Sequence, residues 1–127
     1  MRSTQSTLAV DVRPDGPTVR VRLDGDLDIT SSPLLQTVVD QALAGRRRPL
    51  CQRLVIDMSG VVFADASGMS PLLMARAMLV KRGGSVELQR CRRAVLRLLR
   101  LLDVLDLVAD SGEHGGPTPA GAPESSR

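Results

Sequence analysis

One stretch, residues 54–68, limits most strongly what this chain can fold into. It reads LVIDMSGVVFADASG. Residues 54–56 form a short apolar run with two β-branched side chains, and polar residues at 57–60 close it, so we expect a buried strand. A second apolar run at 61–63 leads into the polar sequence DASG and then into a helical pattern that continues to residue 82. The stretch therefore predicts a strand, a tight polar turn and the positive end of a helix dipole.

Two alternating runs precede this stretch and predict a β-hairpin. Residues 7–12 alternate weakly, and residues 18–24 alternate cleanly, with apolar side chains on one face and charged side chains on the other. The turn-forming sequence PDGP at residues 14–17 separates the two runs, so one face of the hairpin should contact water. We expect the polar sequence GDLD at residues 25–28 to form a loop.

Three segments have the apolar spacing of helices. The first follows TSSP at residues 30–33, which is typical of a hydroxyl N-cap with proline at the first helical position, and Gly45 ends it. The second continues from the DASG turn to the glycines at 83–84. The third covers about residues 92–102, after a short strand at 85–88. The second helix is expected to bury a set of apolar side chains: Leu72, Leu73, Ala75, Ala77, Met78 and Leu79.

This order of elements predicts an α/β fold. After the N-terminal β-hairpin, strands and helices alternate, which favours a mixed β-sheet of four to five strands covered by three to four helices. Residues 104–108 fit either a last helical turn or a short edge strand. We expect one domain over residues 1–110. Residues 111–127 are rich in Gly, Pro and Ser and have no periodicity, which predicts a disordered tail.

Composition and charge argue against a nucleic-acid-binding protein. The net charge of +3 comes almost entirely from arginine, and Phe63 is the only aromatic residue. The chain therefore lacks the aromatic side chains on which bases stack, and we expect no direct nucleic-acid binding. We interpret the basic runs at residues 46–48 and 90–100 as solvated faces, with a partner site as the alternative.

The sequence also lacks the features of membrane proteins, metalloproteins and hydrolases. No stretch approaches 18 apolar residues without charge, and residues 1–15 hold no apolar run of signal-peptide length, so we expect a cytoplasmic protein without membrane contact. Cys51 and Cys91 have no metal-ligand spacing, which predicts reduced thiols and no metal. The only histidine, His114, lies in the predicted tail, which argues against Ser-His-Asp or Cys-His catalysis. No phosphate-binding glycine motif is present, so we expect no cofactor and no enzymatic activity.

The junction between the central strand and the second helix is the candidate site. Asp65 and Ser67 both stand where the helix begins, so either side chain could cap its N–H groups. A phosphate on Ser67 would face the positive helix end beside the Asp65 carboxylate, so a partner would meet very different surfaces before and after modification. Asp57 follows a buried strand, as the phosphoacceptor of a receiver domain does. The acidic pair and late-strand lysine of that chemistry are missing, and we interpret Asp57 as an acceptor for backbone N–H groups of its turn.

Four segments, in the right order and spacing, resemble the STAS family, the sulfate-transporter and anti-sigma-factor-antagonist domain. They are LDGDLD at residues 23–28, the stretch 54–68 with its D-[SA]-[ST]-G turn, RGG at 82–84 and AVLRLL at 94–99. The likeness spans residues 7–108 and is strongest to the single-domain bacterial anti-sigma factor antagonists. It implies a STAS-like mixed sheet with helices.

The resemblance also implies a function. A STAS antagonist binds an anti-sigma factor, often an ATP-dependent serine kinase, and so frees a sigma factor for transcription. In the family, the kinase inactivates the antagonist by phosphorylating the serine directly after the turn aspartate. Here that position is Ala66, so the phosphoswitch is missing or displaced to Ser67. Pro71, which could reshape the start of the helix, and Asp103, where the family commonly has glycine, are further departures.

We predict that the partner binds at the junction, and we expect a monomer or weak homodimer. The predicted contact residues are Asp28, Asp65, Ala66, Ser67, Gly68 and Met69, with Ser67 also the candidate phosphorylation site. Met69 is an adaptable apolar contact if it is exposed and a core residue if it is not. Two alternatives stay open: a STAS scaffold or accessory subunit of a stress-sensing or transport complex, and an enzyme.

Overall fold

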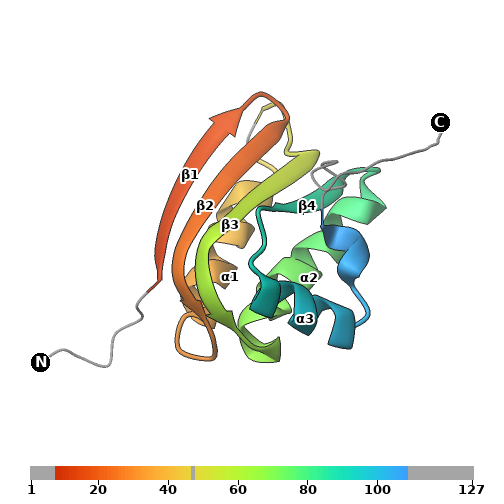
Figure 1. Ribbon diagram of the computed structural model, residues 1–127. Helices are drawn as coiled ribbons and strands as arrows, with labels where there is room; N and C mark the ends of the chain where they lie inside the picture. Colours follow the sequence, from red (N-terminus) through yellow and green to blue (C-terminus); the bar gives the residue numbers. More distant parts are fainter. Residues whose placement is uncertain (1–7, 47, 109–127) are drawn as a thin grey trace, which may run out of the picture.

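A computed structural model describes residues 8–46 and 48–108 of the chain. Its elements follow one another in the order β1 (Ala9–Asp15), β2 (Thr18–Leu27), α1 (Ser32–Leu43), β3 (Arg53–Ala64), α2 (Ala66–Lys81), β4 (Ser85–Gln89), α3 (Arg93–Leu101) and the 3-10 helix η1 (Leu105–Leu107) (Figure 1). The third helix agrees with the prediction to within one residue at each end, and β4 to within one residue at its last.

The four strands form one mixed sheet in the order β1-β2-β3-β4. Strand β1 pairs antiparallel with β2, and β2, β3 and β4 are parallel. The hairpin turns at Gly16, whose φ of 61° suits glycine. Helices α1 and α2 pack against each other and lie behind the sheet in Figure 1, while α3 packs against β3 and η1 against β4. The predicted α/β fold with an N-terminal hairpin is confirmed.

Strands β2 and β3 are longer than the sequence indicates. The predicted loop at residues 25–28 is wrong for residues 25–27, which continue β2, and the two apolar runs of the central stretch belong to one twelve-residue strand. Their pairing shifts register between Arg22 and Asp24 and again after Gly25. At Gly60, a Cβ would lie 2.7 Å from the backbone carbonyl oxygen of Leu23, which favours glycine there. Because of these irregularities, apolar and polar residues do not alternate regularly along the full lengths of β2 and β3, so the sequence pattern does not indicate where these strands end.

Helix α1 begins without the predicted hydroxyl cap. Ser31 precedes it in a helical conformation and its side chain makes no cap hydrogen bond. The buried Ser31 hydroxyl instead accepts a hydrogen bond from the Asp28 N–H at 3.0 Å and donates to the Asp26 carbonyl at 2.8 Å. The helix ends at Leu43, with Ala44 as its C-cap directly before Gly45, and the Leu43 carbonyl accepts a hydrogen bond from Arg82 at 2.8 Å.

The core between the sheet and the helices is aliphatic, as predicted. Its largest fully buried side chains include Leu23, Leu27, Ile56, Met58, Leu72, Leu79 and Leu99. The prediction that Ala77 and Met78 are buried is wrong, because both lie on the exposed face of α2. Cys51 is buried, and burial raises the pKa of the half-buried Cys91 thiol to about 11.

The end of the described chain combines both structures considered for residues 104–108. The 3-10 helix η1 forms first, and Val108 then makes a single parallel bridge with Leu88 of β4. The tail predicted from residue 111 lies outside the described residues, so the domain boundary stays a prediction. No helix in the described part of the chain is long and apolar enough to span a membrane.

Candidate functional site

The junction lies at the edge of the sheet where β2 and β3 end side by side. Leu27 and Ala64, the last residues of these parallel strands, are partners in the sheet. Asp28 and Asp65 follow them directly, and the Asp65 N–H donates a hydrogen bond to the Leu27 carbonyl at 3.0 Å. Two segments that are distant in the sequence are thereby joined at the point where α2 begins.

Asp65 is the residue that caps α2. Its backbone is extended, and its carboxylate accepts a hydrogen bond from the Gly68 N–H at 2.9 Å. This confirms that one of Asp65 and Ser67 caps the helix. Because Asp65 performs this role, the Ser67 side chain does not, and Ser67 and Ala66 are exposed on the first turn.

Gly68 is where α2 touches the sheet most closely. A Cβ at this position would lie 2.0 Å from the carbonyl carbon of Leu27, 2.2 Å from its oxygen and 2.5 Å from the Asp28 nitrogen. These are backbone atoms, which cannot move aside as a flexible side chain would. Glycine is therefore required for α2 to start against the end of β2.

Asp28 organises the turn between β2 and α1. Its carboxylate accepts hydrogen bonds from the Thr30 hydroxyl at 2.6 Å, the Thr30 N–H at 3.0 Å and the Ser31 N–H at 3.2 Å. The Thr30 hydroxyl is the largest influence and holds the pKa of Asp28 below its ordinary value. Asp28 is therefore a charged, half-buried group at the site, with part of its hydrogen-bonding capacity used inside the protein.

The predicted site residues divide into exposed and buried sets. Ala66 and Ser67 are exposed, Asp28 and Asp65 are half-buried, and Gly68 is buried. The Met69 side chain is 0% exposed. The prediction that Met69 contacts the partner is therefore wrong, and the alternative, that Met69 is a core residue, is confirmed. Met69, the fourth residue of α2, points toward the core because the close approach of Gly68 to β2 places this side of the first turn against the sheet.

Proline at position 71 does not displace the start of α2. The helix begins at Ala66 and Pro71 is buried inside it. Because proline has no N–H, it cannot donate the usual helical hydrogen bond to the carbonyl four residues earlier, which belongs to Ser67.

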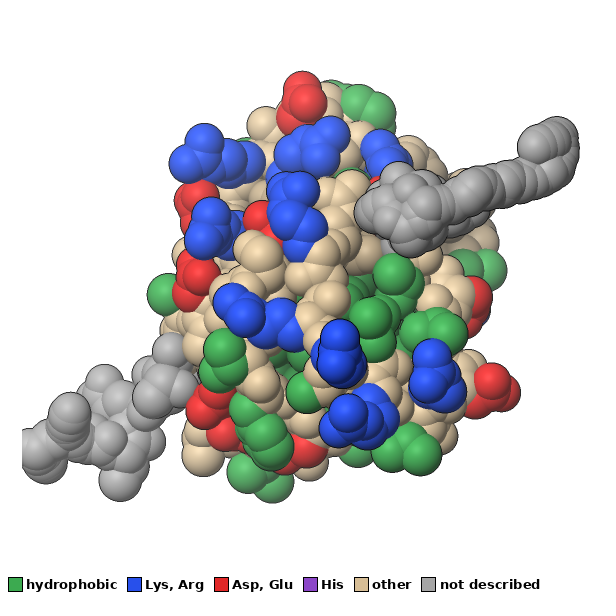
Figure 2. Space-filling view, viewed as in Figure 1, with side chains coloured by type: hydrophobic (Ala, Val, Ile, Leu, Met, Phe, Trp, Pro, Cys, Tyr) green, Lys and Arg blue, Asp and Glu red, His purple; other side chains and the backbone are tan. Residues whose placement is uncertain are grey.

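Three exposed apolar side chains at this end of the molecule were not predicted as site residues. Ile29 is 71% exposed, Val62 59% and Phe63 50%. Ile29 follows the end of β2, and the other two belong to the last three residues of β3. Figure 2 shows hydrophobic side chains gathered at the lower end of the molecule, where β3 leads into α2 in Figure 1. An adjacent apolar pair that ends a strand, followed directly by a polar turn, is the sequence signal that could have indicated them.

Among the residues that the structure describes, no group of three or more His, Cys, Asp or Glu side chains could hold a metal. What the junction presents is an exposed hydroxyl, two carboxylates and apolar side chains on a helix amino end. Such a combination is typical of a protein-binding surface.

Two curated proteins are similar in sequence to most of this chain. An anti-sigma-B factor antagonist of Bacillus subtilis (strain 168) is 25% identical over 108 residues, which cover 84% of this chain and 94% of the relative. An anti-sigma F factor antagonist of Paenibacillus polymyxa is 29% identical over 79 residues, which cover 62% of this chain and 65% of the relative.

Solved structures share the fold. The anti-sigma factor antagonist SpoIIAA in its unphosphorylated form matches with a TM-score of 0.70 and 19% identity, covering 84% of this chain and 90% of SpoIIAA. An anti-sigma factor antagonist from Mycobacterium paratuberculosis matches with a TM-score of 0.66 and 19% identity, covering 93% and 88%. The family described as "Mlab, STAS domain" matches residues 10–109. This chain belongs to the STAS domain family.

Proposed function

We propose that this protein is an anti-sigma factor antagonist, which binds an anti-sigma factor and so frees a sigma factor for transcription in the cytoplasm. Its STAS membership and its similarity along 94% of the Bacillus subtilis anti-sigma-B factor antagonist support this function. One observation of the structure carries the proposal. The amino end of α2 is exposed and stands at the same sheet edge as the apolar side chains of Ile29, Val62 and Phe63.

The protein acts by contact, without making or breaking bonds. Phe63 and Ile29 provide the apolar area from which a partner gains most of its binding free energy. The Ser67 hydroxyl and the Asp28 and Asp65 carboxylates provide polar contacts that set the orientation. The partner-binding surface therefore comprises Asp28, Ile29, Phe63, Asp65, Ala66 and Ser67, and Gly68 and Met69 support it from below.

Charge at the start of α2 controls docking. Ala66 cannot be phosphorylated, whereas the neighbouring Ser67 is exposed and accessible to a kinase. A phosphate on Ser67 would stand beside the Asp65 carboxylate, which already occupies the Gly68 N–H, so like charges would accumulate where the partner binds. The switch of this protein is thus either absent or displaced to Ser67, and the anti-sigma factor is a serine kinase in the second case.

The test begins with recovery of the partner and continues with charge variants. The full chain is used to capture binding proteins from its source cells, and the recovered partner is titrated against Ser67→Ala and Ser67→Asp. We expect near-normal affinity for Ser67→Ala and a loss of about tenfold or more for Ser67→Asp. A matched control is Ala94→Asp, because Ala94 is exposed and is the second residue of α3, as Ser67 is of α2.

Two results would contradict the proposal. Recovery of a transporter or a large multi-subunit particle in place of an anti-sigma factor would favour the scaffold function. Equal weakening by Ser67→Asp and Ala94→Asp would show that the partner responds to net charge and not to the junction. Incubation with the recovered partner and ATP, followed by mass spectrometry, then decides between the two forms of the switch. Modification of Ser67 indicates displacement, and no modification indicates absence.

A further inference from the structure

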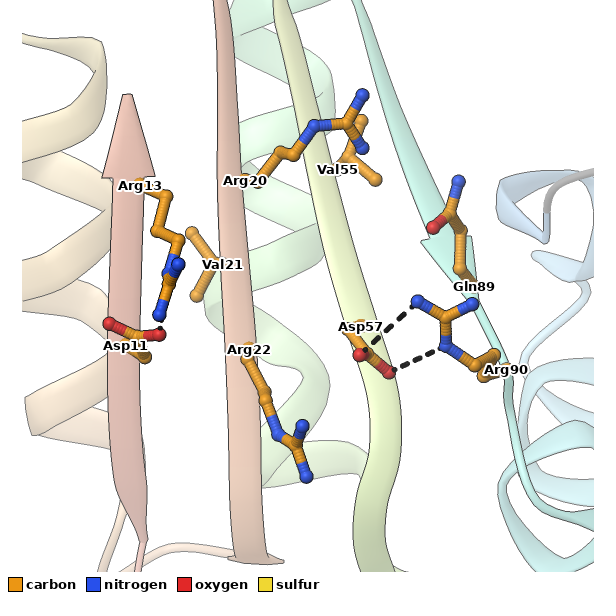
Figure 3. Close-up of a pocket in the computed structure, with 9 residues that line it drawn as sticks. All are labelled: Asp11, Arg13, Arg20, Val21, Arg22, Val55, Asp57, Gln89 and Arg90. Carbon is orange, nitrogen blue, oxygen red and sulfur yellow. Dashed lines mark hydrogen bonds and ion pairs between the residues drawn. The ribbon is translucent and has the colours of Figure 1, made fainter. Parts of the chain in front are cut away.

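The face of the sheet opposite α1 and α2 carries an arginine-rich groove. The groove has a volume of about 250 Å³ and crosses the middle of the strands (Figure 3). Four arginines line it: Arg13, Arg20, Arg22 and Arg90. In Figure 2, Lys and Arg side chains gather over this face, with acidic side chains between them. None of these residues belongs to the junction described above.

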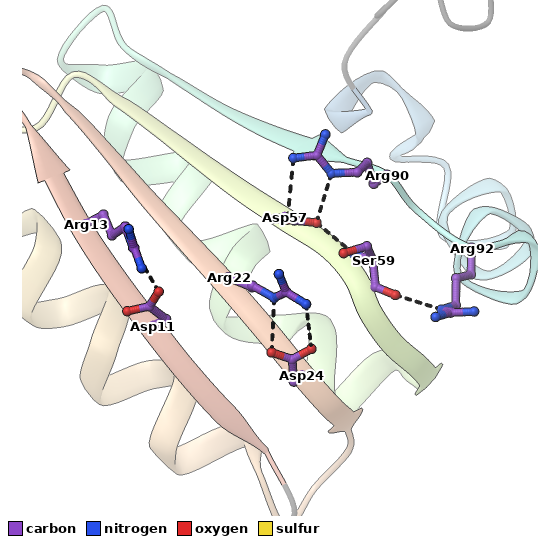
Figure 4. Close-up of polar contacts among 8 residues, drawn as sticks. All are labelled: Asp11, Arg13, Arg22, Asp24, Asp57, Ser59, Arg90 and Arg92. Atoms are coloured by element: carbon purple, nitrogen blue, oxygen red, sulfur yellow. Dashed lines mark hydrogen bonds and ion pairs between the residues drawn. The ribbon is translucent and has the colours of Figure 1, made fainter.

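Two of the four arginines are engaged with nearby carboxylates. Arg13 contacts Asp11 at 2.9 Å, and Arg22 contacts Asp24 at 3.2 Å (Figure 4). Each pair joins residues two apart on one strand, so the guanidinium and the carboxylate lie on the same face. These two arginines are largely neutralised.

The other two arginines, Arg20 and Arg90, form no short ion pair with a carboxylate of the described residues. Within residues 8–46 and 48–108, no carboxylate lies within ion-pair distance of the Arg20 guanidinium. The Glu87 carboxylate, with which Arg20 interacts electrostatically at longer range, is paired with Arg53 at 2.6 Å. Arg90 faces Asp57 at 3.4 and 3.5 Å, whereas charge-assisted hydrogen bonds are usually about 2.7–2.9 Å long. Both guanidinium groups can therefore bind an additional oxyanion without first breaking a short ion pair.

Backbone geometry holds Arg90 over the groove. Arg90 follows β4 with a φ of 56°, in the left-handed region that is strained for a residue other than glycine. Strain of this kind is often retained where it positions a functional side chain. Here it directs the guanidinium back toward β3 and Asp57, as Figure 3 shows.

The two arginines approach an apolar floor from opposite sides. Val55 is a sheet partner of Arg20, so both side chains point to the outer face, yet Val55 is only 2% exposed. In Figure 3, the Arg20 guanidinium reaches across β3 beside Val55, and the Arg90 guanidinium reaches toward β3 from the end of β4. A ligand between them would meet two positive groups over a floor that includes Val55, with Glu87, the β4 sheet partner of Val55, in the same row.

We propose that this groove binds a small phosphate monoester, with the phosphate between Arg20 and Arg90 and the ester group over Val55. A dianionic phosphate matches the charge and the planar, paired donors of two guanidinium groups. The interleaved Asp11, Asp24 and Asp57 carboxylates exclude a long polyanion, because they would repel the charges on either side of the bound phosphate. The site is independent of the partner surface at α2.

The experiment uses phenyl phosphate as the probe, with NMR signals of the arginine Nε–H groups as the readout at constant ionic strength. We expect saturable shifts of the Arg20 and Arg90 signals, and weaker binding of inorganic phosphate and of benzoate. Inorganic phosphate lacks the apolar group, and benzoate carries only one negative charge. Binding of all three probes with equal affinity would overturn the proposal, as would the absence of saturable shifts up to about 10 mM.

Three variants test the roles of the arginines. Arg20→Gln and Arg90→Asn are each expected to weaken phenyl phosphate binding by about tenfold or more. Asparagine is chosen at position 90 because it tolerates the left-handed conformation. The matched control is Arg13→Gln, which removes the same charge from the same face and is expected to change the affinity by less than about twofold. Equal weakening by Arg13→Gln, or tighter binding of a hexaglutamate peptide than of phenyl phosphate, would contradict the proposed site.

Discussion

Helices α2 and α3 end in the same way but are anchored differently. At the carboxyl end of α2, Gly83 and Gly84 donate to the carbonyls of Val80 and Leu79 at 3.0 and 2.7 Å. At the end of α3, the corresponding donors are Asp103 and Val104, and the acceptors are the carbonyls of Arg100 and Leu99 at 3.1 and 2.9 Å. Both are Schellman motifs, which need a left-handed residue directly after the cap.

The left-handed residue distinguishes the two motifs. It is Gly83 in α2, with a φ of 78°, and Asp103 in α3, with a φ of 60°. Glycine adopts this conformation without a steric penalty, whereas a residue with a Cβ is destabilised there. Helix α3 is therefore terminated by the same hydrogen bonds at a higher conformational cost.

The amino ends differ as well. Asp65 caps α2 with its carboxylate, and Gly68 seats the first turn on β2. Helix α3 has no side-chain cap hydrogen bond at Arg92, and it depends on its buried face, Val95 and Leu99. The comparison indicates that the structure fixes α2 at both ends, and α2 is the helix whose amino end we propose as the docking surface.

The largest expected effect on stability comes from Gly68→Ala, which prevents the first turn of α2 from approaching the end of β2 closely. Its methyl group would overlap backbone atoms of Leu27 and Asp28, and we expect the free energy of unfolding to fall by at least about 2–3 kcal/mol. Denaturant unfolding measures this. Gly45→Ala is the control, because a Cβ at Gly45 meets nothing within 4 Å. A loss below about 1 kcal/mol for Gly68→Ala would mean that α2 is not fixed by this contact.

The cap is tested by Asp65→Ala, which should lower the free energy of unfolding by about 1 kcal/mol because the Gly68 N–H loses its acceptor. Asp65→Asn retains a side-chain oxygen at the same position and should lose less than about 0.5 kcal/mol. Chemical denaturation of the three proteins at one pH gives the comparison. Equal losses for alanine and asparagine would show that the carboxylate charge, and not the cap hydrogen bond, stabilises the start of α2.

The contrast between the carboxyl ends is tested by exchanging their residues. We expect Asp103→Gly to raise the free energy of unfolding by about 0.5–1 kcal/mol, since glycine removes the strain at a φ of 60°. The reciprocal change, Gly83→Ala, should lower it by about 1 kcal/mol at a φ of 78°. Thermal unfolding monitored by circular dichroism detects both shifts. If Asp103→Gly is destabilising, the Asp103 side chain makes a contribution that outweighs its backbone strain.

Acid should loosen the junction before it affects α3. The pKa of Asp28 lies below its ordinary value of 3.8, because the Thr30 hydroxyl and nearby N–H groups stabilise the charged form. Asp28 therefore binds a proton more readily in the unfolded chain than in the folded protein. The stability that the charged Asp28 contributes is fully present above about pH 3.8, and it is lost as the pH falls through the lower pKa of the folded protein. NMR titration should show the amides of Thr30 and Ser31 shifting with Asp28. Asp28→Asn should remove this dependence and leave the α3 amides unchanged.

The sequence predicted the topology better than the extent of the strands. The alternation of Val19, Val21 and Leu23 predicted an inward face that the structure confirms. The polar residues Asp57 and Ser59 predict the end of a strand, but the structure places both inside β3. They are tolerated within β3 because helices α1 and α2 cover only one face of the sheet, and coverage depends on tertiary packing that local patterns do not contain.

The site was predicted in position but not in detail. The change of polarity at Asp65 correctly indicated the cap and the helix amino end. The inward orientation of Met69 depends on how closely Gly68 approaches Leu27, which is a contact between segments about forty residues apart in the sequence. Likewise, the Arg90–Asp57 contact in the groove depends on the register of β3 and β4. Long-range register and close backbone approach were therefore the missing information.

The direct backbone contact between Gly68 and Leu27 has a further consequence for recognition. Because it leaves no room for a side chain between them, the contact fixes the position of the first turn of α2 against the loop after β2. A partner that docks there, as we propose, would meet a surface that is already ordered, and little conformational entropy would be lost when the complex forms. Binding of this kind should be fast and should leave the shape of the molecule nearly unchanged.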